Sequence, residues 1–203
     1  MRDAGHVPQF ASHEEPLLIA AMRFYRLTFD TSRPFAQLQI CSDASGRRIE
    51  LGTFVKAQVF RGPVPLKAEI AHPGLMGDVS FPVEGPVVRA SLAAEMRALA
   101  GDDVQWIDVE VEGAADRFMV MNTLREFDCV DEQRSVVSYA KSDGKLPPDI
   151  RYRGIGQLHI RGDVVGDSNV FRVARWDVAL IVSEEMRRVL ESHEATGVHF
   201  LPV

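Results

Sequence analysis

The chain has 203 residues, 46% of them hydrophobic, and 29 acidic side chains against 23 basic ones give a formal net charge of −6. This provides apolar material for a substantial core, while the acidic balance disfavours general attraction to nucleic acid or to an anionic membrane. No apolar run approaches the roughly 18 residues that span a bilayer. His13, Glu14 and Glu15 precede the short apolar segment 16–22, where a secretory signal would carry positive charge. We therefore expect a cytoplasmic protein with no membrane or nucleic-acid partner.

The N-terminal half of the chain shows strand patterns separated by turn-forming residues. Residues 1–21 have weak periodicity, and alternation of apolar and polar residues starts at Met22. We therefore expect 1–21 to be an N-terminal extension outside the core and 22–203 to form a single domain. Residues 35–60 predict strands broken by a turn, and the prolines of 63–86 predict an irregular, loop-rich connection.

Helical and strand periodicities follow one another in the middle of the chain. Residues 92–99 predict a helix, and the alternating residues 104–111 and 118–124 predict two strands joined as a hairpin. Residues 136–139 predict a further strand. The polar segment 141–148, which contains glycine and proline, predicts a flexible loop.

The C-terminal part predicts short strands followed by one capped helix. Apolar residues at 158–160 and 170–173 stand between turn-forming residues. Ser183 is placed to accept a hydrogen bond from the first turn of a helix, and Gly197 ends that unit before a closing strand over 198–203.

Residues 181–203 repeat the pattern of residues 87–109 at a constant offset of 94. Apolar character coincides, with little identity, in the pairs Val88/Val182, Leu92/Met186, Met96/Leu190, Val104/Val198, Trp106/Phe200, Ile107/Leu201 and Val109/Val203. Each copy predicts a strand, an amphipathic helix and a strand, and two such units would bury their apolar faces against each other or a shared core. Chance similarity between two amphipathic segments is the alternative. The predicted fold is α+β, with mixed, mostly antiparallel strands.

The sequence contains no motif that would bind a nucleotide, a cofactor or a metal. Phosphate-binding loops and the Gly-x-Gly-x-x-Gly fingerprint are absent, and Gly-Ile-Gly at 154–156 is better interpreted as a turn. The six histidines are dispersed, and no His-x-x-x-His or Cys-x-x-Cys element could begin a zinc site. We expect no cofactor and no metal.

One cluster of acids invites a catalytic interpretation. Asp128, Asp131 and Glu132 could serve a small hydrolase or bind a hard cation, with His159 as a base. Solvated turn acids that accept hydrogen bonds from nearby backbone amides are the favoured alternative, because Asp commonly does so in turns.

Only two cysteines are present, Cys41 and Cys129, and they are far apart in the sequence. In a reducing cytoplasm both should be inert buried thiols. A redox-sensitive disulfide is the alternative, and Cys129 is then the expected participant, because a turn between two acids should leave it more accessible.

The C-terminal third carries a family resemblance. Its closing block has a Phe-Arg strand, an apolar strand ending in Val-Ser, a helix and a Gly-Val-x-Phe-x-Pro strand. The residues that match are Phe171, Arg172, Trp176, Val182, Ser183, Gly197, Val198, Phe200 and Pro202. A second block matches through Asn122, Asp128, Cys129, Asp131 and Ser135, and Arg23–Leu27 is also similar. In these blocks the chain resembles the eleventh family of immunity proteins from bacterial polymorphic toxin systems, and we expect most of the matching residues to be structural.

The resemblance implies a non-enzymatic antitoxin that binds and neutralises a cognate toxin, typically encoded by a neighbouring gene. Two alternatives stay open: a hydrolase that uses the carboxylates of Asp128, Asp131 and Glu132, and a general protein-interaction module. The neighbouring reading frame, and co-purification with its product, would discriminate between them.

A strand rich in acids is the candidate toxin-binding surface. Residues 102–117 contain six acids and one base, Arg117. The six acids form an acidic edge that consists of Asp102, Asp103, Asp108, Glu110, Glu112 and Asp116. The alternation places Asp108, Glu110 and Glu112 on one strand face, where they could steer a basic toxin. An ordinary solvated strand face is the alternative.

Overall fold

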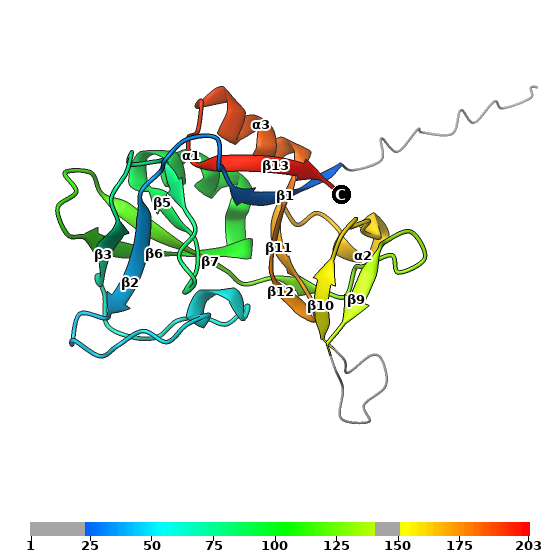
Figure 1. Ribbon diagram of the computed structural model, residues 1–203, viewed down its shortest axis with the longest axis horizontal. Coiled ribbons are helices and arrows are strands. Elements are labelled where there is room, and N and C mark those ends of the chain that lie inside the picture. The colour runs from blue at the N-terminus through cyan, green and yellow to red at the C-terminus, as the bar shows by residue number, and fades with distance from the viewer. Residues whose placement is uncertain (1–22, 141–150) are drawn as a thin grey trace, which may run out of the picture.

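The computed structural model describes residues 23–140 and 151–203, and every structural statement refers to these residues (Figure 1). They contain 13 strands and three α-helices, which confirms the predicted α+β fold with mostly antiparallel strands. The predicted extension over 1–21, its boundary at Met22 and the predicted loop at 141–148 lie outside the described residues. Among those described, no helix is long and apolar enough to cross a membrane.

One sheet is built from the two ends of the chain. Its five strands are, in spatial order, β13 (Val198–Pro202), β1 (Phe24–Phe29), β12 (Trp176–Ser183), β11 (Val170–Val173) and β8 (Glu126–Phe127). All neighbours are antiparallel except β11 and β8. Because β1 lies between β12 and β13, the first described strand completes the sheet that the last strands form.

A second sheet of six strands holds most of the remaining chain. In spatial order it contains β2 (Gln37–Ser42), β3 (Leu66–His72), β6 (Val104–Val111), β7 (Phe118–Thr123), β5 (Val87–Arg89) and β4 (Val79–Ser80). Only β3 and β6 are parallel neighbours. A separate hairpin pairs β9 (Val137–Tyr139) with β10 (Tyr152–Ile155).

Three α-helices and two short 3₁₀ turns connect these strands. The helices are α1 (Ala90–Ala100), α2 (Gly162–Val165) and α3 (Glu184–Ser192), and the turns are η1 (Thr53–Val55) and η2 (Gly101–Asp103). In Figure 1, α3 lies above β13 and β1, next to α1. The Ser183 hydroxyl accepts a hydrogen bond from the Met186 amide at 3.1 Å, which confirms the predicted helix cap.

The predicted repeat corresponds to two β-α-β units with the same strand register. In the first unit, Val88 of β5 pairs with Met119 of β7, which pairs with Asp108 of β6. In the second unit, Val182 of β12 pairs with Tyr25 of β1, which pairs with Pro202 of β13. The offset of 94 therefore relates both outer strands of one unit to those of the other. The central strand follows the unit in one case and precedes it in the other.

The two units bury their helices against each other, as the apolar pattern predicts. The equivalent residues Leu92 and Met186 are both buried, as are Met96 and Leu190. All four belong to one hydrophobic cluster that also contains Val88 and Val182. A second cluster fills the face of the six-stranded sheet that is turned away from α1. A third lies between the five-stranded sheet and the β9–β10 hairpin.

Three predicted segments differ from the structure. Within 35–60 the strand β2 forms before the turn, but the residues after the turn contain the short η1 and no strand. The proline-rich stretch 63–86 contains the seven-residue strand β3 and the short β4, so the prediction of an irregular loop there was wrong. Its prolines stand before, between and after the strands, where a missing backbone N–H costs no ladder hydrogen bond. Residues 158–160 form no strand and contribute only an isolated bridge between Ile160 and Val130.

Candidate functional site

The predicted acidic face forms along the second half of β6 and at Glu112, the residue that follows the strand. The side chains of Asp108, Glu110 and Glu112 are exposed, whereas Val109 and Val111 between them are buried. Val104 and Trp106, earlier on the same face, pack in the cluster around α1. Since the helix covers only the start of the strand, the three acids extend beyond it into solvent.

The rest of the predicted acidic edge does not join this face. Asp103 is 8% exposed, and its carboxylate accepts hydrogen bonds from the backbone amides of Asn169 at 2.8 Å and Val170 at 3.3 Å. It therefore connects the two sheets instead of facing a partner. Asp102 precedes the strand, at its opposite end, and Asp116 forms an ion pair with Arg89. The continuous acidic face reduces to Asp108, Glu110 and Glu112.

Two basic side chains border the acidic face. Arg117 lies 3.7 Å from Asp108, and both side chains are more than half exposed, so the pair contributes little to stability. Lys67 of β3 is the register partner of Glu110. A hollow of about 530 Å³ adjoins these acids, and Val64, Pro65 and Asp116 contribute to its wall. The face thus adjoins a concave margin of mixed apolar and charged residues.

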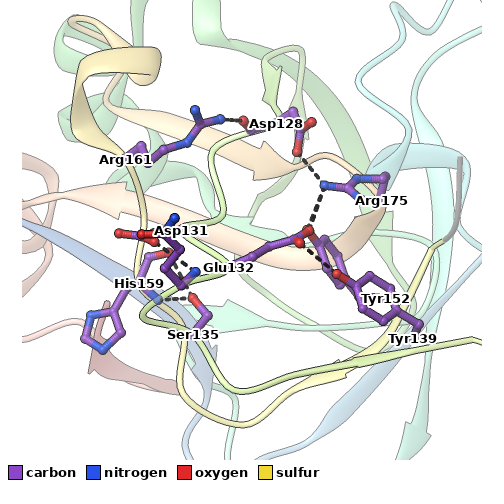
Figure 2. A network of polar contacts seen from close by, with 10 residues as sticks. Asp128, Asp131, Glu132, Ser135, Tyr139, Tyr152, His159, Arg161 and Arg175 are labelled. Carbon is purple, nitrogen blue, oxygen red and sulfur yellow. Dashed lines mark hydrogen bonds and ion pairs between the residues drawn. The ribbon is translucent and has the colours of Figure 1, made fainter. Parts of the chain in front are cut away.

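The carboxylates at 128 and 132 meet on one arginine (Figure 2). Arg175, in the two-residue loop between β11 and β12, donates to Asp128 at 2.9 Å and to Glu132 at 3.3 Å. The hydroxyls of Tyr139 and Tyr152 donate to Glu132 at 2.7 and 2.5 Å. The hydrogen bonds from Tyr152 and then Tyr139 lower the pKa of Glu132.

This network does not assemble the hydrolase that the three acids suggest. Asp131 accepts hydrogen bonds from the backbone amides of Gln133 and Arg134, as a turn acid does. In Figure 2 the imidazole of His159 points away from Glu132. A general acid needs a raised pKa, and that of Glu132 is lowered. Within residues 23–140 and 151–203, no three metal-ligating side chains come together.

The prediction that Cys129 is the more accessible thiol was wrong. Its side chain is fully buried, whereas Cys41 is partly exposed, and both are free thiols. Burial raises the pKa of the Cys129 thiol to about 12, which leaves almost no reactive thiolate at neutral pH. Cys129 packs as a small apolar group beside Val130 and Phe171 in the cluster under the hairpin.

Most of the residues that carried the resemblance are buried, as expected of structural residues. Phe171 packs edge-to-face between Phe24 and Phe127, at centroid distances of 5.5 and 5.4 Å. Arg172 is also buried, which lowers the pKa of its guanidinium to about 10, and it donates to the Asp177 carbonyl at 3.3 Å. The guanidinium of Arg26 lies over the ring of Trp176, with its Cζ 4.5 Å from the ring centroid.

The remaining motif residues fix turns and crossings between segments. The side-chain amide of Asn122 donates to the Gln58 carbonyl at 2.8 Å, and the Ser135 hydroxyl accepts from the His159 amide at 2.9 Å. Gly197 has a φ of +84° and lies against the backbone of Val79, where a β-carbon would clash. Phe200 is half-buried against Tyr25, and Pro202 is exposed at the end of the last strand.

Comparison with known proteins identifies the family. A model of the immunity protein family (Imm11) matches residues 93–203, which is more than half of the chain. The chain belongs to the Imm11 immunity protein family. The matched region runs from α1 to the last strand and contains the acidic face and every motif residue from Asn122 to Pro202. No curated protein matches the chain.

Membership of the Imm11 family confirms the predicted resemblance, and with it the general role of an immunity protein. Proteins of this family neutralise toxins and are typically non-enzymatic, so they act by binding. A non-enzymatic role agrees with the carboxylates of Asp128 and Asp131, which accept hydrogen bonds from Arg175 and from a backbone amide.

Proposed function

We propose that this chain binds a cognate toxin, encoded by a neighbouring gene, and neutralises it in the cytoplasm by occluding it. Membership of the immunity family is the observation that carries the proposal. A stoichiometric inhibitor needs a rigid scaffold and a complementary surface, and it needs no catalytic groups. The shared core of the two units supplies such a scaffold.

We further propose that the toxin is basic and that the acidic face of β6 contributes to its capture. The net charge of −6 and the exposed carboxylates of Asp108, Glu110 and Glu112 favour a basic partner. Complementary charges speed encounter more than they strengthen the final complex. Because the three acids are exposed, replacing them should leave the fold intact.

Co-expression tests the function. The toxin gene beside this one is expressed in a susceptible bacterium with and without the chain, and survival is counted. We expect survival only when both are present, together with co-purification of the two proteins. Unchanged killing with both proteins soluble would contradict the proposal, and capture of a partner that is not a toxin would favour the general interaction module.

Charge reversal tests the acidic face. With all three acids replaced by lysine, association with the toxin in low salt should slow by roughly tenfold or more, and the salt dependence should flatten. Arg117→Glu is the opposite control and should speed association. Stopped-flow rates at low and high salt measure both. Wild-type rates from a correctly folded triple variant would place the interface elsewhere.

A further inference from the structure

A hollow lies where the six-stranded sheet fails to close on itself. Its lining comes mainly from β2 and from β4 with the segment that follows it, which are the two edge strands of the sheet. The end of β3, Phe29 and Leu51 complete it. The hollow measures about 420 Å³, and Leu38, Phe81, Leu51 and Val83 give it largely apolar walls. We call it the edge-strand hollow. It is separate from the acidic face, which belongs to the central strand β6.

The rim of this hollow is unusually apolar for a surface. Val83 is 69% exposed and Leu51 is 63% exposed, and among the described large hydrophobic residues no other side chain is as exposed as these two. Both line the same hollow. Single exposed apolar residues need no explanation, but two around one concavity are typical of a contact site.

Glu84 places a buried carboxylate in the same lining. The residue is 2% exposed, and its Oε2 accepts no hydrogen bond from the described residues. A buried carboxylate oxygen without a donor is unfavourable, so such a group calls for an explanation, and a ligand that supplies the missing donor is one. A cationic donor supplies both the missing hydrogen bond and the opposite charge.

The backbone holds this arrangement in place before any partner binds. The carbonyls of Val83 and Glu84 accept hydrogen bonds from Gly52 at 3.2 Å and Phe54 at 2.8 Å. Gly85 has a φ of +153°, and a β-carbon there would run into Phe54, so this close approach requires glycine. The backbone of Val83 and Glu84 is therefore fixed to η1, where Phe54 is buried, and this order lowers the entropic cost of binding.

We infer that the edge-strand hollow receives one arginine or lysine side chain of the toxin, which pairs with Glu84 while its aliphatic stem packs between Leu51 and Val83. Arginine suits this geometry best, because its planar fork binds a carboxylate through two donors and its stem covers apolar surface. The inference rests on the proposed function for the identity of the partner. A cation that pairs with Glu84 agrees with a basic toxin, but this contact lies away from the acidic face.

Glu84→Gln separates a binding role from a structural one. The change keeps the shape of the side chain and removes its charge, so the affinity for the toxin product of the neighbouring gene should fall at least tenfold, chiefly through faster dissociation. The melting temperature should stay equal or rise, because an uncompensated buried carboxylate is lost. The matched control is Glu185→Gln, an exposed acid on α3, which should change affinity less than twofold.

A second variant and a small probe keep the test decisive. Val83→Ser alters only the exposed rim and should weaken toxin binding at least threefold, even if Glu84→Gln folds poorly. N-acetyl-arginine amide, titrated into the wild-type protein, should shift the NMR signals of the Val83 and Glu84 amides in a saturable way, and Glu84→Gln should abolish the shift. Unchanged toxin affinity in folded variants, or no saturable shift, would overturn the inference. If wild-type protein takes up the probe but binds no toxin, the proposed function fails while the cation site stands.

Discussion

The two β-α-β units share one architecture and differ at their margins. Both place a helix over three strands with the same register, and equivalent helix residues meet in one core. In the first unit β6 continues past its helix into the exposed acids, and β2 and β3 extend the sheet further. In the second unit the equivalent strand β13 spans only Val198–Pro202. The shared part is thus the scaffold, and the candidate binding surfaces lie in what the first unit adds.

The helices of the two units are stabilised in different ways. In α1, seven of 11 residues are alanine or leucine, which have high helix propensity, and no side chain caps its start. In α3 the start is capped by Ser183, and Glu184 and Glu191 both pair with Arg187 on the outer surface. The same packing is therefore reached through burial and propensity in one copy and through capping and charge in the other.

The largest expected effect is loss of the contact between the helices. Met96→Ala and Leu190→Ala remove equivalent, fully buried side chains, and each should lower the free energy of unfolding by about 2–5 kcal/mol. Urea denaturation measures both. The control is Arg97→Ala at an exposed position, whose free energy of unfolding should stay within about 0.5 kcal/mol of wild type. A large loss in only one variant would show that the two units do not share the core equally.

A glycine pair tests the junction between the second unit and β4. Gly197→Ala should cost about 2–5 kcal/mol, because alanine is strained at positive φ and its β-carbon would also clash with the Val79 carbonyl. Gly113 has a φ of +78° with open space around it, so Gly113→Ala should cost only about 1–2 kcal/mol. Equal losses in thermal unfolding would mean that the close approach to Val79 contributes nothing.

The smallest effect concerns the helix starts. Ser183→Ala removes the cap of α3 and a 2.6 Å hydrogen bond to Asn169, and should cost about 1–2 kcal/mol. Ser91→Ala in α1 changes an exposed residue that caps nothing, and should be neutral or stabilise by up to about 0.5 kcal/mol. Chemical denaturation of both variants measures the difference, and a neutral Ser183→Ala would show that burial alone holds α3.

The sequence predicts this fold where a local pattern decides it. The repeat, the β6–β7 hairpin and the Ser183 cap depend on periodicity or on one side chain, and the structure confirms them. Strand β3 was missed, because its pairing with β6 is formed between residues about 40 positions apart in the sequence and flanking prolines dominated the local signal.

The candidate surfaces were only partly predictable for the same reason. Alternation along one strand found Asp108, Glu110 and Glu112, but it could not show that Asp103 turns inward to Asn169 or that Lys67 lies beside Glu110. Glu84 carries no motif at all. Its importance appears only when β2 and β4, the distant edges of one sheet, approach each other.

Hydrogen exchange of the chain alone and in complex with the toxin of the neighbouring gene tests most directly whether the shared scaffold and the binding surface are separate. The account predicts slower exchange on binding at 108–112 and at 79–85, where the acidic face and the edge-strand hollow lie. It predicts unchanged exchange in α3 and β13. Protection centred on α3, with none at 79–85 or 108–112, would contradict it and place the toxin on the part that the two units share.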